Sequence, residues 1–111
     1  MAATELQEEC DLSIDAEALI DLTELAYGGK WPGMFPSPGG SDEFLRLFLF
    51  QTKCEREKLE AMKEKVCGLV DHGEVITLTI IPFADLWKEA PDAKALSALA
   101  LYNNLKAAGK L

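Results

Sequence analysis

Apolar side chains gather in short runs along the chain, separated by charged or glycine-rich stretches. Residues 44–50 (FLRLFLF) are almost wholly apolar, which predicts a strand at the centre of a sheet, buried on both faces. Residues 75–81 (VITLTII) alternate apolar residues with threonine, and the strand that they predict ends at Pro82. Residues 16–27 (AEALIDLTELAY) fit either a strand or a short helix, because their apolar positions follow neither period clearly.

Polar and apolar positions elsewhere predict four helical segments. The candidate helical segments are residues 2–10, 55–66, 83–89 and 92–108. The first begins without a capping residue before it. The second is either a mixed-charge helix or an ordered charged loop. The last is expected to have Asp92 as its N-cap and Gly109 as its C-cap.

Residues 28–43 (GGKWPGMFPSPGGSDE) contain five glycines and three prolines, which predicts a long ordered loop. Loops of this length in a compact domain are usually functional or disordered. Residues 68–74 (GLVDHGE) predict a turn, and no internal repeat is present.

The composition is that of an ordinary globular domain. The chain has 111 residues, of which 49% are apolar and 27% charged, enough for one domain and a single core. No run of about 18 apolar residues exists, which excludes a membrane span. The N-terminal residues carry neither a basic nor an apolar segment of a signal peptide. We therefore expect an intracellular protein that is not secreted.

The net charge of -8 argues against nucleic acid as a partner, because binding to phosphates requires a basic face. An acidic chain can still bind a phosphate ligand if a divalent metal ion bridges the two. The three cysteines are an odd number and form no C-x-x-C pair, which predicts reduced thiols.

Three acidic residues near the N-terminus share one face of the predicted helix. Glu5, Glu8 and Glu9 are spaced i, i+3 and i+4, so they occupy an arc of about 100°. The arrangement fits a solvated acidic face or a site for Mg²⁺, which prefers carboxylate oxygens. On spacing alone, the solvated face is favoured.

The segment T-E-L-Q-E-E-C-D-L, residues 4–12, resembles the second half of the Nudix box, G-x5-E-x7-R-E-U-x-E-E-x-G-U. Its glutamates fall on the metal-binding positions of that box. Thr4 stands where the box has Arg, and Asp11 where it has Gly. The resemblance implies that Glu5, Glu8 and Glu9 bind Mg²⁺, with Mn²⁺ as an alternative.

Three later segments resemble the ADP-sugar pyrophosphatase branch of Nudix hydrolases, most closely the plant-type ADP-sugar diphosphatases. Residues 35–43 resemble its substrate loop, residues 68–76 the loop that carries a candidate catalytic acid or base, and residues 92–102 its C-terminal helix. The segments lie in the family's order, and the resemblance covers about residues 4–108. It implies substrate-binding roles for Gly39, Gly40, Ser41, Asp42 and Glu43.

The same resemblance implies an α+β fold, an α/β/α sandwich with a mixed sheet that is incomplete at its N-terminus. Residues 1–111 would be the C-terminal portion of one Nudix domain, because the chain begins inside the box helix. The implied reaction is hydrolysis of a nucleoside diphosphate-sugar, such as ADP-ribose or ADP-glucose, to a nucleoside monophosphate and a sugar phosphate. A homodimer in the cytoplasm or a plastid is expected.

The implied catalytic residues are Glu74, which would take the proton from water, together with Glu5 on the metal-binding face. His72, the single histidine, is either a second candidate base or a solvated loop residue. The alternative function is a non-catalytic Nudix-like fragment or subunit with a role in assembly, which the Thr4 departure favours.

Other residues have two interpretations each. Gly39 and Gly40 either let the backbone approach a diphosphate or sugar, or supply positive φ in a turn. Asp42 and Glu43 either touch the ligand or cap the loop. Trp31 and Phe35 either stack on an adenine, or pack in the core and anchor the loop. Cys67 and Trp87 are most simply core residues.

Overall fold

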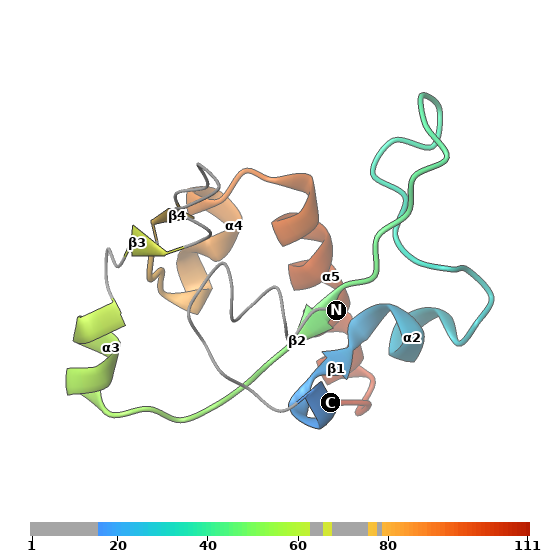
Figure 1. Ribbon diagram of the computed structural model, residues 1–111. Coiled ribbons are helices and arrows are strands. Elements are labelled where there is room, and N and C mark those ends of the chain that lie inside the picture. Colours follow the sequence, from blue (N-terminus) through green and yellow to red (C-terminus); the bar gives the residue numbers. More distant parts are fainter. Residues whose placement is uncertain (1–15, 63–65, 68–75, 78) are drawn as a thin grey trace. The chain divides into compact units, whose positions relative to one another are not determined.

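The computed structural model describes residues 16–62, 66–67, 76–77 and 79–111 (Figure 1). The helix predicted for residues 2–10 and the turn predicted for residues 68–74 lie outside them. The chain divides into two compact units, one formed by residues 1–19 and 50–81 and the other by residues 20–49 and 82–111.

The described elements combine short strands with helices. They are, in chain order, η1 (Ala16–Ala18), β1 (Ile20–Asp21), α2 (Leu22–Tyr27), β2 (Phe48–Leu49), α3 (Arg56–Met62), β3 (Val66–Cys67), β4 (Ile76–Thr77), η3 (Phe83–Asp85), α4 (Leu86–Glu89) and α5 (Ala93–Ala107). Within the described residues they form two antiparallel sheets of two strands each. This combination is compatible with an α+β protein.

Residues 16–27 contain both of the structures that their pattern allowed. The 3-10 turn η1 is followed by β1, and the helix α2 begins directly after it. Asp21 caps this helix by accepting a 3.0 Å hydrogen bond from the Glu24 N–H, which satisfies a donor that has no partner inside the helix. Gly28 ends the helix at φ 56° and donates to the Glu24 carbonyl, a conformation that costs glycine little.

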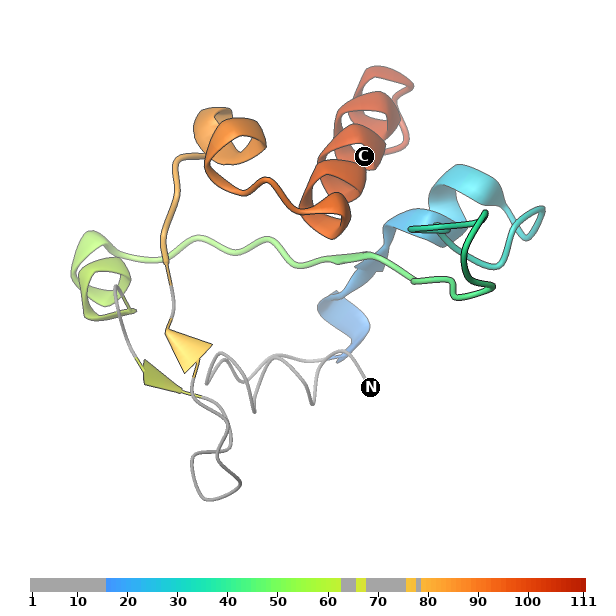
Figure 2. The same cartoon turned by 90° about the horizontal axis from the view of Figure 1, so that it is seen from above.

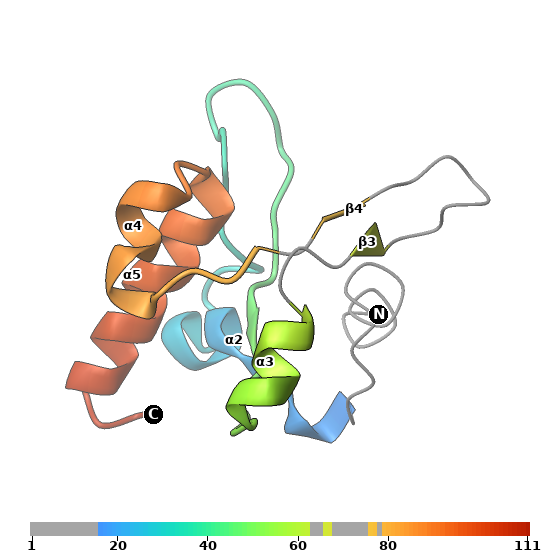
Figure 3. The same cartoon turned by 90° about the vertical axis from the view of Figure 1, so that its left-hand side faces the viewer.

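The small core of the unit formed by residues 20–49 and 82–111 joins three segments that are far apart in sequence. Leu22 on α2, Met34 in the long loop and Leu105 on α5 are its buried apolar residues, and Thr23 is a buried polar one. Helix α5 contacts both α2 and α4 (Figures 2 and 3). This core holds the base of the long loop against the C-terminal helix.

The expectation of a central strand over residues 44–50 is wrong in extent and in position. Only Phe48–Leu49 forms a strand, and it pairs with β1 alone among the described residues. Phe44 and Phe48 are 48% and 43% exposed. The run is mostly apolar, but these two aromatic side chains are turned outward, because two short strands cannot cover both faces of the segment.

The unit formed by residues 1–19 and 50–81 contains α3 and the β3–β4 pair. The helical alternative for residues 55–66 is confirmed over Arg56–Met62. The strand expected over residues 75–81 is confirmed at Ile76–Thr77, which pairs antiparallel with β3. Residues 79–81 have no regular structure, so the strand ends before Pro82.

The C-terminal helices agree closely with the sequence pattern. Residues 83–89 form the 3-10 turn η3 and one turn of α4. Asp92 caps α5 by accepting from the Ala95 N–H, as predicted. The C-cap, however, is Ala108, and Gly109 follows it at φ 76°. The Gly109 N–H donates to the Lys106 carbonyl and the Lys110 N–H to the Leu105 carbonyl, and together the two bonds make the end a Schellman motif.

Trp87 is not a core residue, because its side chain is 60% exposed. Helix α4 has four residues and contacts α5, so a single turn has little surface with which to bury an indole. The expectation that the Cys67 side chain is buried lies outside what the structure describes. No helix among the described residues has both the length and the apolar character needed to cross a bilayer.

Candidate functional site

The structure describes the predicted substrate loop but not the predicted metal and acid–base residues. Glu5, Glu8 and Glu9 lie outside the described residues, as do His72 and Glu74. Across residues 16–62, 66–67, 76–77 and 79–111, no three His, Cys, Asp or Glu side chains are grouped so that they could hold a metal ion. The observed geometry therefore concerns the loop between α2 and β2.

The tip of this loop, which we define as Ser37–Glu43, is a turn closed by its own backbone. The Gly40 and Ser41 N–H groups donate to the Ser37 carbonyl at 3.0 and 2.8 Å, and the Glu43 N–H donates to Ser41 Oγ at 3.0 Å. The five predicted substrate residues are all exposed. The structure thus brings Gly39, Gly40, Ser41, Asp42 and Glu43 together on one accessible turn.

Neither Gly39 nor Gly40 has a positive φ, since only Gly28, Gly29 and Gly109 do among the described glycines. The interpretation that they supply positive φ in a turn is therefore wrong. A Cβ placed on Gly39 would meet nothing within 4 Å. The open space above Gly39 leaves room for a ligand to approach the backbone.

The stem of the loop, which we define as Gly33–Met34 and Phe44–Leu45, is held by backbone pairing. Met34 and Leu45 form an antiparallel bridge, and each donates its N–H to the other's carbonyl at 2.8 Å. A Cβ on Gly33 would collide with the Leu45 carbonyl oxygen. Gly33 is therefore the residue that lets the two sides of the stem approach.

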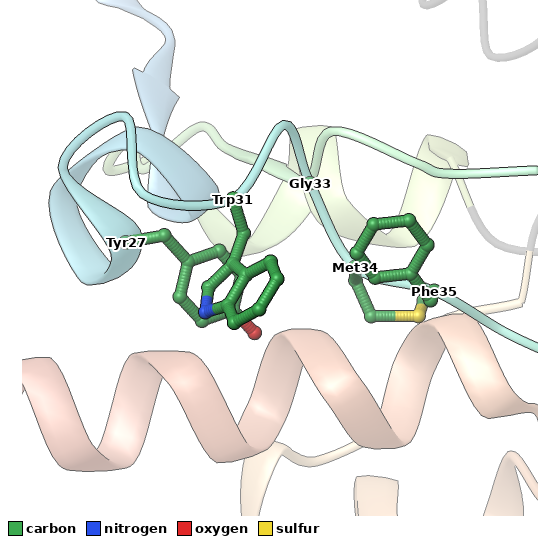
Figure 4. A pocket seen from close by; sticks show the side chains of 5 residues that line it. All are labelled: Tyr27, Trp31, Gly33, Met34 and Phe35. Carbon is green, nitrogen blue, oxygen red and sulfur yellow. The ribbon is translucent and has the colours of Figure 1, made fainter. Parts of the chain in front are cut away.

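A pocket of about 350 Å³ opens beside the stem. Its lining comes from the end of α2 and the first part of the loop, and consists of Tyr27, Trp31, Gly33, Met34 and Phe35. In Figure 4, Tyr27 and Trp31 form one side of the pocket and Met34 and Phe35 the other, with Gly33 between them. Three of its five side-chain positions are aromatic, and no charged residue lines it.

The two aromatic residues that the sequence singled out do not pack in the core. Trp31 is 53% exposed and Phe35 37% exposed. Their ring centroids are 6.5 Å apart with an interplanar angle of 88°, and Phe35 makes a similar edge contact with Phe44. The alternative of loop anchoring is supported by these ring contacts, which connect the two sides of the stem.

Sequence reasoning missed three lining residues of the pocket, namely Tyr27, Gly33 and Met34. A signal for Tyr27 was present, because it stands four residues before Trp31 and directly before the helix-ending Gly28. No comparable signal marked Gly33, since five glycines in the same loop look alike until the Leu45 carbonyl is placed.

An ion-pair cluster that the sequence did not indicate anchors the segment that returns from the loop. Arg46 Nη2 lies 3.1 Å from Asp21 Oδ2 and 3.2 Å from Glu24 Oε2. The Leu22 N–H also donates to the Leu47 carbonyl at 2.8 Å. The lone cation in an otherwise apolar run was the available signal, and its partners on β1 and α2 required the fold.

The chain is 37% identical over 101 residues to "Nudix hydrolase 14, chloroplastic" of Arabidopsis thaliana. The matched part is 91% of this chain and 33% of that protein, so the chain spans about a third of the length of the curated relative. No protein-family model matches the chain, and no solved structure matches it. The similarity to the Arabidopsis protein supports the Nudix family.

Proposed function

We propose that this chain is a portion of a Nudix hydrolase that cleaves a nucleoside diphosphate-sugar of the ADP-ribose or ADP-glucose type. The observation that carries the proposal is the 37% identity to a Nudix hydrolase over 91% of the chain. The resemblance of residues 4–12 to the second half of the Nudix box also supports it. The products would be a nucleoside monophosphate and a sugar phosphate.

The proposed chemistry is attack of water on one phosphorus of the diphosphate. The bond from that phosphorus to the bridging oxygen breaks, and the other phosphate leaves with this oxygen. Glu74 takes the proton of the attacking water, and His72 is the weaker candidate for this role. The exposed tip, Ser37–Glu43, positions the substrate through its backbone and through Ser41, Asp42 and Glu43.

The donor set formed by Glu5, Glu8 and Glu9 is chemically suited to Mg²⁺ or Mn²⁺, because hard cations prefer carboxylate oxygens. A cation held there would neutralise the negative charge that develops on the phosphate oxygens. Because this neutralisation would assist the reaction, Glu5 is counted among the proposed catalytic residues. The three carboxylates would hold the cation.

The proposal extends to the assembly and location of the protein. We place residues 1–111 in the C-terminal portion of an α/β/α Nudix sandwich and expect a homodimer, because a sheet with few strands leaves unpaired edges. The relative's name includes "chloroplastic", which supports a plastid rather than the cytoplasm as the location.

The test is release of AMP from ADP-ribose and from ADP-glucose by the purified chain, and by the complete gene product, with and without Mg²⁺. Glu8→Gln and Glu9→Gln should each lower the Mg²⁺-dependent rate by orders of magnitude. Glu74→Gln should lower kcat by about 10²–10⁴-fold, the usual range for a general base, and His72→Asn much less. Unchanged turnover in the two metal-face variants would refute the assignment of that face.

A second candidate function is a non-catalytic subunit that keeps a Nudix-like fold for assembly. The specific observation in its favour is Thr4, which stands at the box position of Arg. Under this alternative, the complete protein would release no AMP from either substrate at any concentration of Mg²⁺ or Mn²⁺.

A further inference from the structure

We propose that the pocket lined by Tyr27, Trp31, Gly33, Met34 and Phe35 binds the base of the nucleotide. The inference rests on the proposed function and deepens it, because it assigns the nucleoside half of the substrate to one pocket. It separates that pocket from the exposed tip of the same loop.

The size of the pocket suits a single planar ring system. At about 350 Å³ it is at the lower end of the range of about 300–1,000 Å³ for small-molecule sites. Met34 is buried and forms part of one wall, whereas the aromatic residues keep exposed surface. A ligand in the pocket would therefore cover aromatic surface that is now open to water.

The walls have the geometry of a stacking site. The rings of Trp31 and Phe35 are nearly perpendicular, with their centroids 6.5 Å apart. A base that lies flat on one ring therefore stands edge-on to the other, and aromatic groups attract each other in both arrangements. Such a corner holds a flat heterocycle better than a branched sugar, which has no aromatic face.

Two polar groups on the aromatic walls are available to the heteroatoms of a base. Within the part of the chain that the structure describes, the Tyr27 hydroxyl and Trp31 Nε1 have no hydrogen-bond partner. The indole N–H is a donor and the phenol is a donor and an acceptor. A purine or pyrimidine carries ring nitrogens and exocyclic groups that complement both.

The charge around the pocket favours an anionic ligand in an otherwise acidic chain. The overall net charge is -8, yet no carboxylate lines the pocket. The Lys30 ammonium lies 5.9 Å from the centroid of the Trp31 ring. A nucleotide with its base in the pocket would thus find a cation nearby for its phosphate.

The position of the pocket along the chain also fits this assignment. Phe35 is its last lining residue and the first residue of the segment that resembles a substrate loop. A base held at the stem leaves the tip, Ser37–Glu43, for the diphosphate and the sugar. The two parts of one loop would then recognise the two ends of one substrate.

The experiment is a fluorescence titration of the full 111-residue chain with the substitution Trp87→Phe. The chain has two tryptophans, so this substitution leaves Trp31 as the single fluorescent tryptophan. The probes are AMP and ribose 5-phosphate, both in EDTA, so that no divalent cation contributes to binding. We expect AMP to quench Trp31 and ribose 5-phosphate to leave it unchanged. Equal quenching by the two probes would overturn the inference, because it would show recognition of phosphate and not of the base.

Variants then test the walls. Phe35→Leu in the same background should raise the Kd for AMP by about 5- to 100-fold, the range expected for loss of one base–aromatic stack. The matched control is Phe48→Leu, since Phe48 is 43% exposed, close to the 37% of Phe35, and lies outside the pocket. Far-UV circular dichroism shows whether each variant keeps its helices.

Trp31→Leu removes the fluorescent probe, so its Kd for AMP is measured by calorimetry, with the same expected range. Unchanged affinity in both Phe35→Leu and Trp31→Leu would overturn the assignment of the pocket. AMP binding by the chain, together with no AMP release from ADP-ribose by the complete gene product, would support the pocket and refute the hydrolase. AMP release without quenching of Trp31 by AMP would support the hydrolase and refute the pocket.

Discussion

The stem and the tip of the long loop have different structures. Both contain glycine and both follow a proline, but the stem is fixed by the Met34–Leu45 bridge, whereas the tip is closed by bonds within Ser37–Glu43. Gly33 in the stem is buried, and Gly39 in the tip is exposed. One loop therefore combines a segment that belongs to the core with a segment that faces solvent.

This difference shows that glycine serves two purposes in one loop. At Gly33 the absence of a side chain lets the Leu45 carbonyl approach, which is a requirement of packing. A Cβ at Gly39 would meet nothing within 4 Å, so packing does not require glycine there. The absence of a side chain instead leaves the backbone accessible to a ligand.

Gly33→Ala should destabilise the chain by about 1–3 kcal/mol, because the new methyl group meets backbone that cannot move aside as a flexible side chain would. The matched control is Gly39→Ala, for which we expect a change within about 0.5 kcal/mol. Urea unfolding followed by circular dichroism gives both values. Equal free energies of unfolding for the two variants would remove the distinction between stem and tip.

Asp21→Ala should cost about 0.5–2 kcal/mol of unfolding free energy, because it removes the N-cap of α2. It also removes the ion pair with Arg46, which anchors the segment that returns from the loop. Asp21→Asn keeps a capping side chain and loses only the charge, so it should cost about 0.2–1 kcal/mol. The same urea experiment compares the pair, and an Asn variant as unstable as the Ala variant would contradict the capping role.

Ser41→Ala tests the tip. It removes the exposed hydrogen bond from the Glu43 N–H, and its effect on the unfolding free energy should be within about 0.5 kcal/mol. If the tip binds the diphosphate-sugar as proposed, KM should nevertheless rise by about tenfold, since a hydrogen bond to a charged group is lost. A large loss of stability with unchanged KM would show that the tip is structural.

The smallest effect concerns pH and the cap of α5, away from the loop. The hydrogen bond from the Lys94 ammonium lowers the pKa of Asp92 below its ordinary value of 3.8. A lowered folded-state pKa means that the contribution of Asp92 to stability is present above pH 3.8 and is lost as the pH falls through the folded value.

Asp92→Asn should therefore lower the thermal midpoint slightly at neutral pH and leave it nearly unchanged at a pH below both values. Thermal unfolding of the two proteins at each pH measures the difference. A difference in midpoint that grows toward acid pH would contradict the assigned direction.

Local chemistry made several elements predictable. The Asp92 cap follows from a short-range signal, because a capping side chain and its N–H partner are three residues apart. The loop over residues 28–43 followed from its glycines and prolines, which disfavour regular structure. In each case the interacting groups are near neighbours in sequence.

The strand predicted over residues 44–50 shows what local sequence signals do not determine. Its apolar run indicated burial on both faces, but burial depends on what covers the segment. Among the described residues, β2 has β1 as its single partner strand, and Phe48 stays exposed. Trp87 failed as a core residue for the same reason, because an aromatic side chain is buried only where another element covers it.

By itself, therefore, the sequence determined the Asp92 cap of α5, the position of the long loop and the segment at its tip that resembles a substrate loop, since neighbouring residues decide these features. Only the tertiary structure decided that Gly33 meets Leu45, that Arg46 pairs with Asp21 and Glu24, and that Tyr27, Trp31 and Phe35 enclose one pocket. Those contacts join residues from different segments or opposite sides of a loop. Their formation depends on how the chain closes that loop, and the entropy lost in closing it is repaid by contacts that no local pattern encodes.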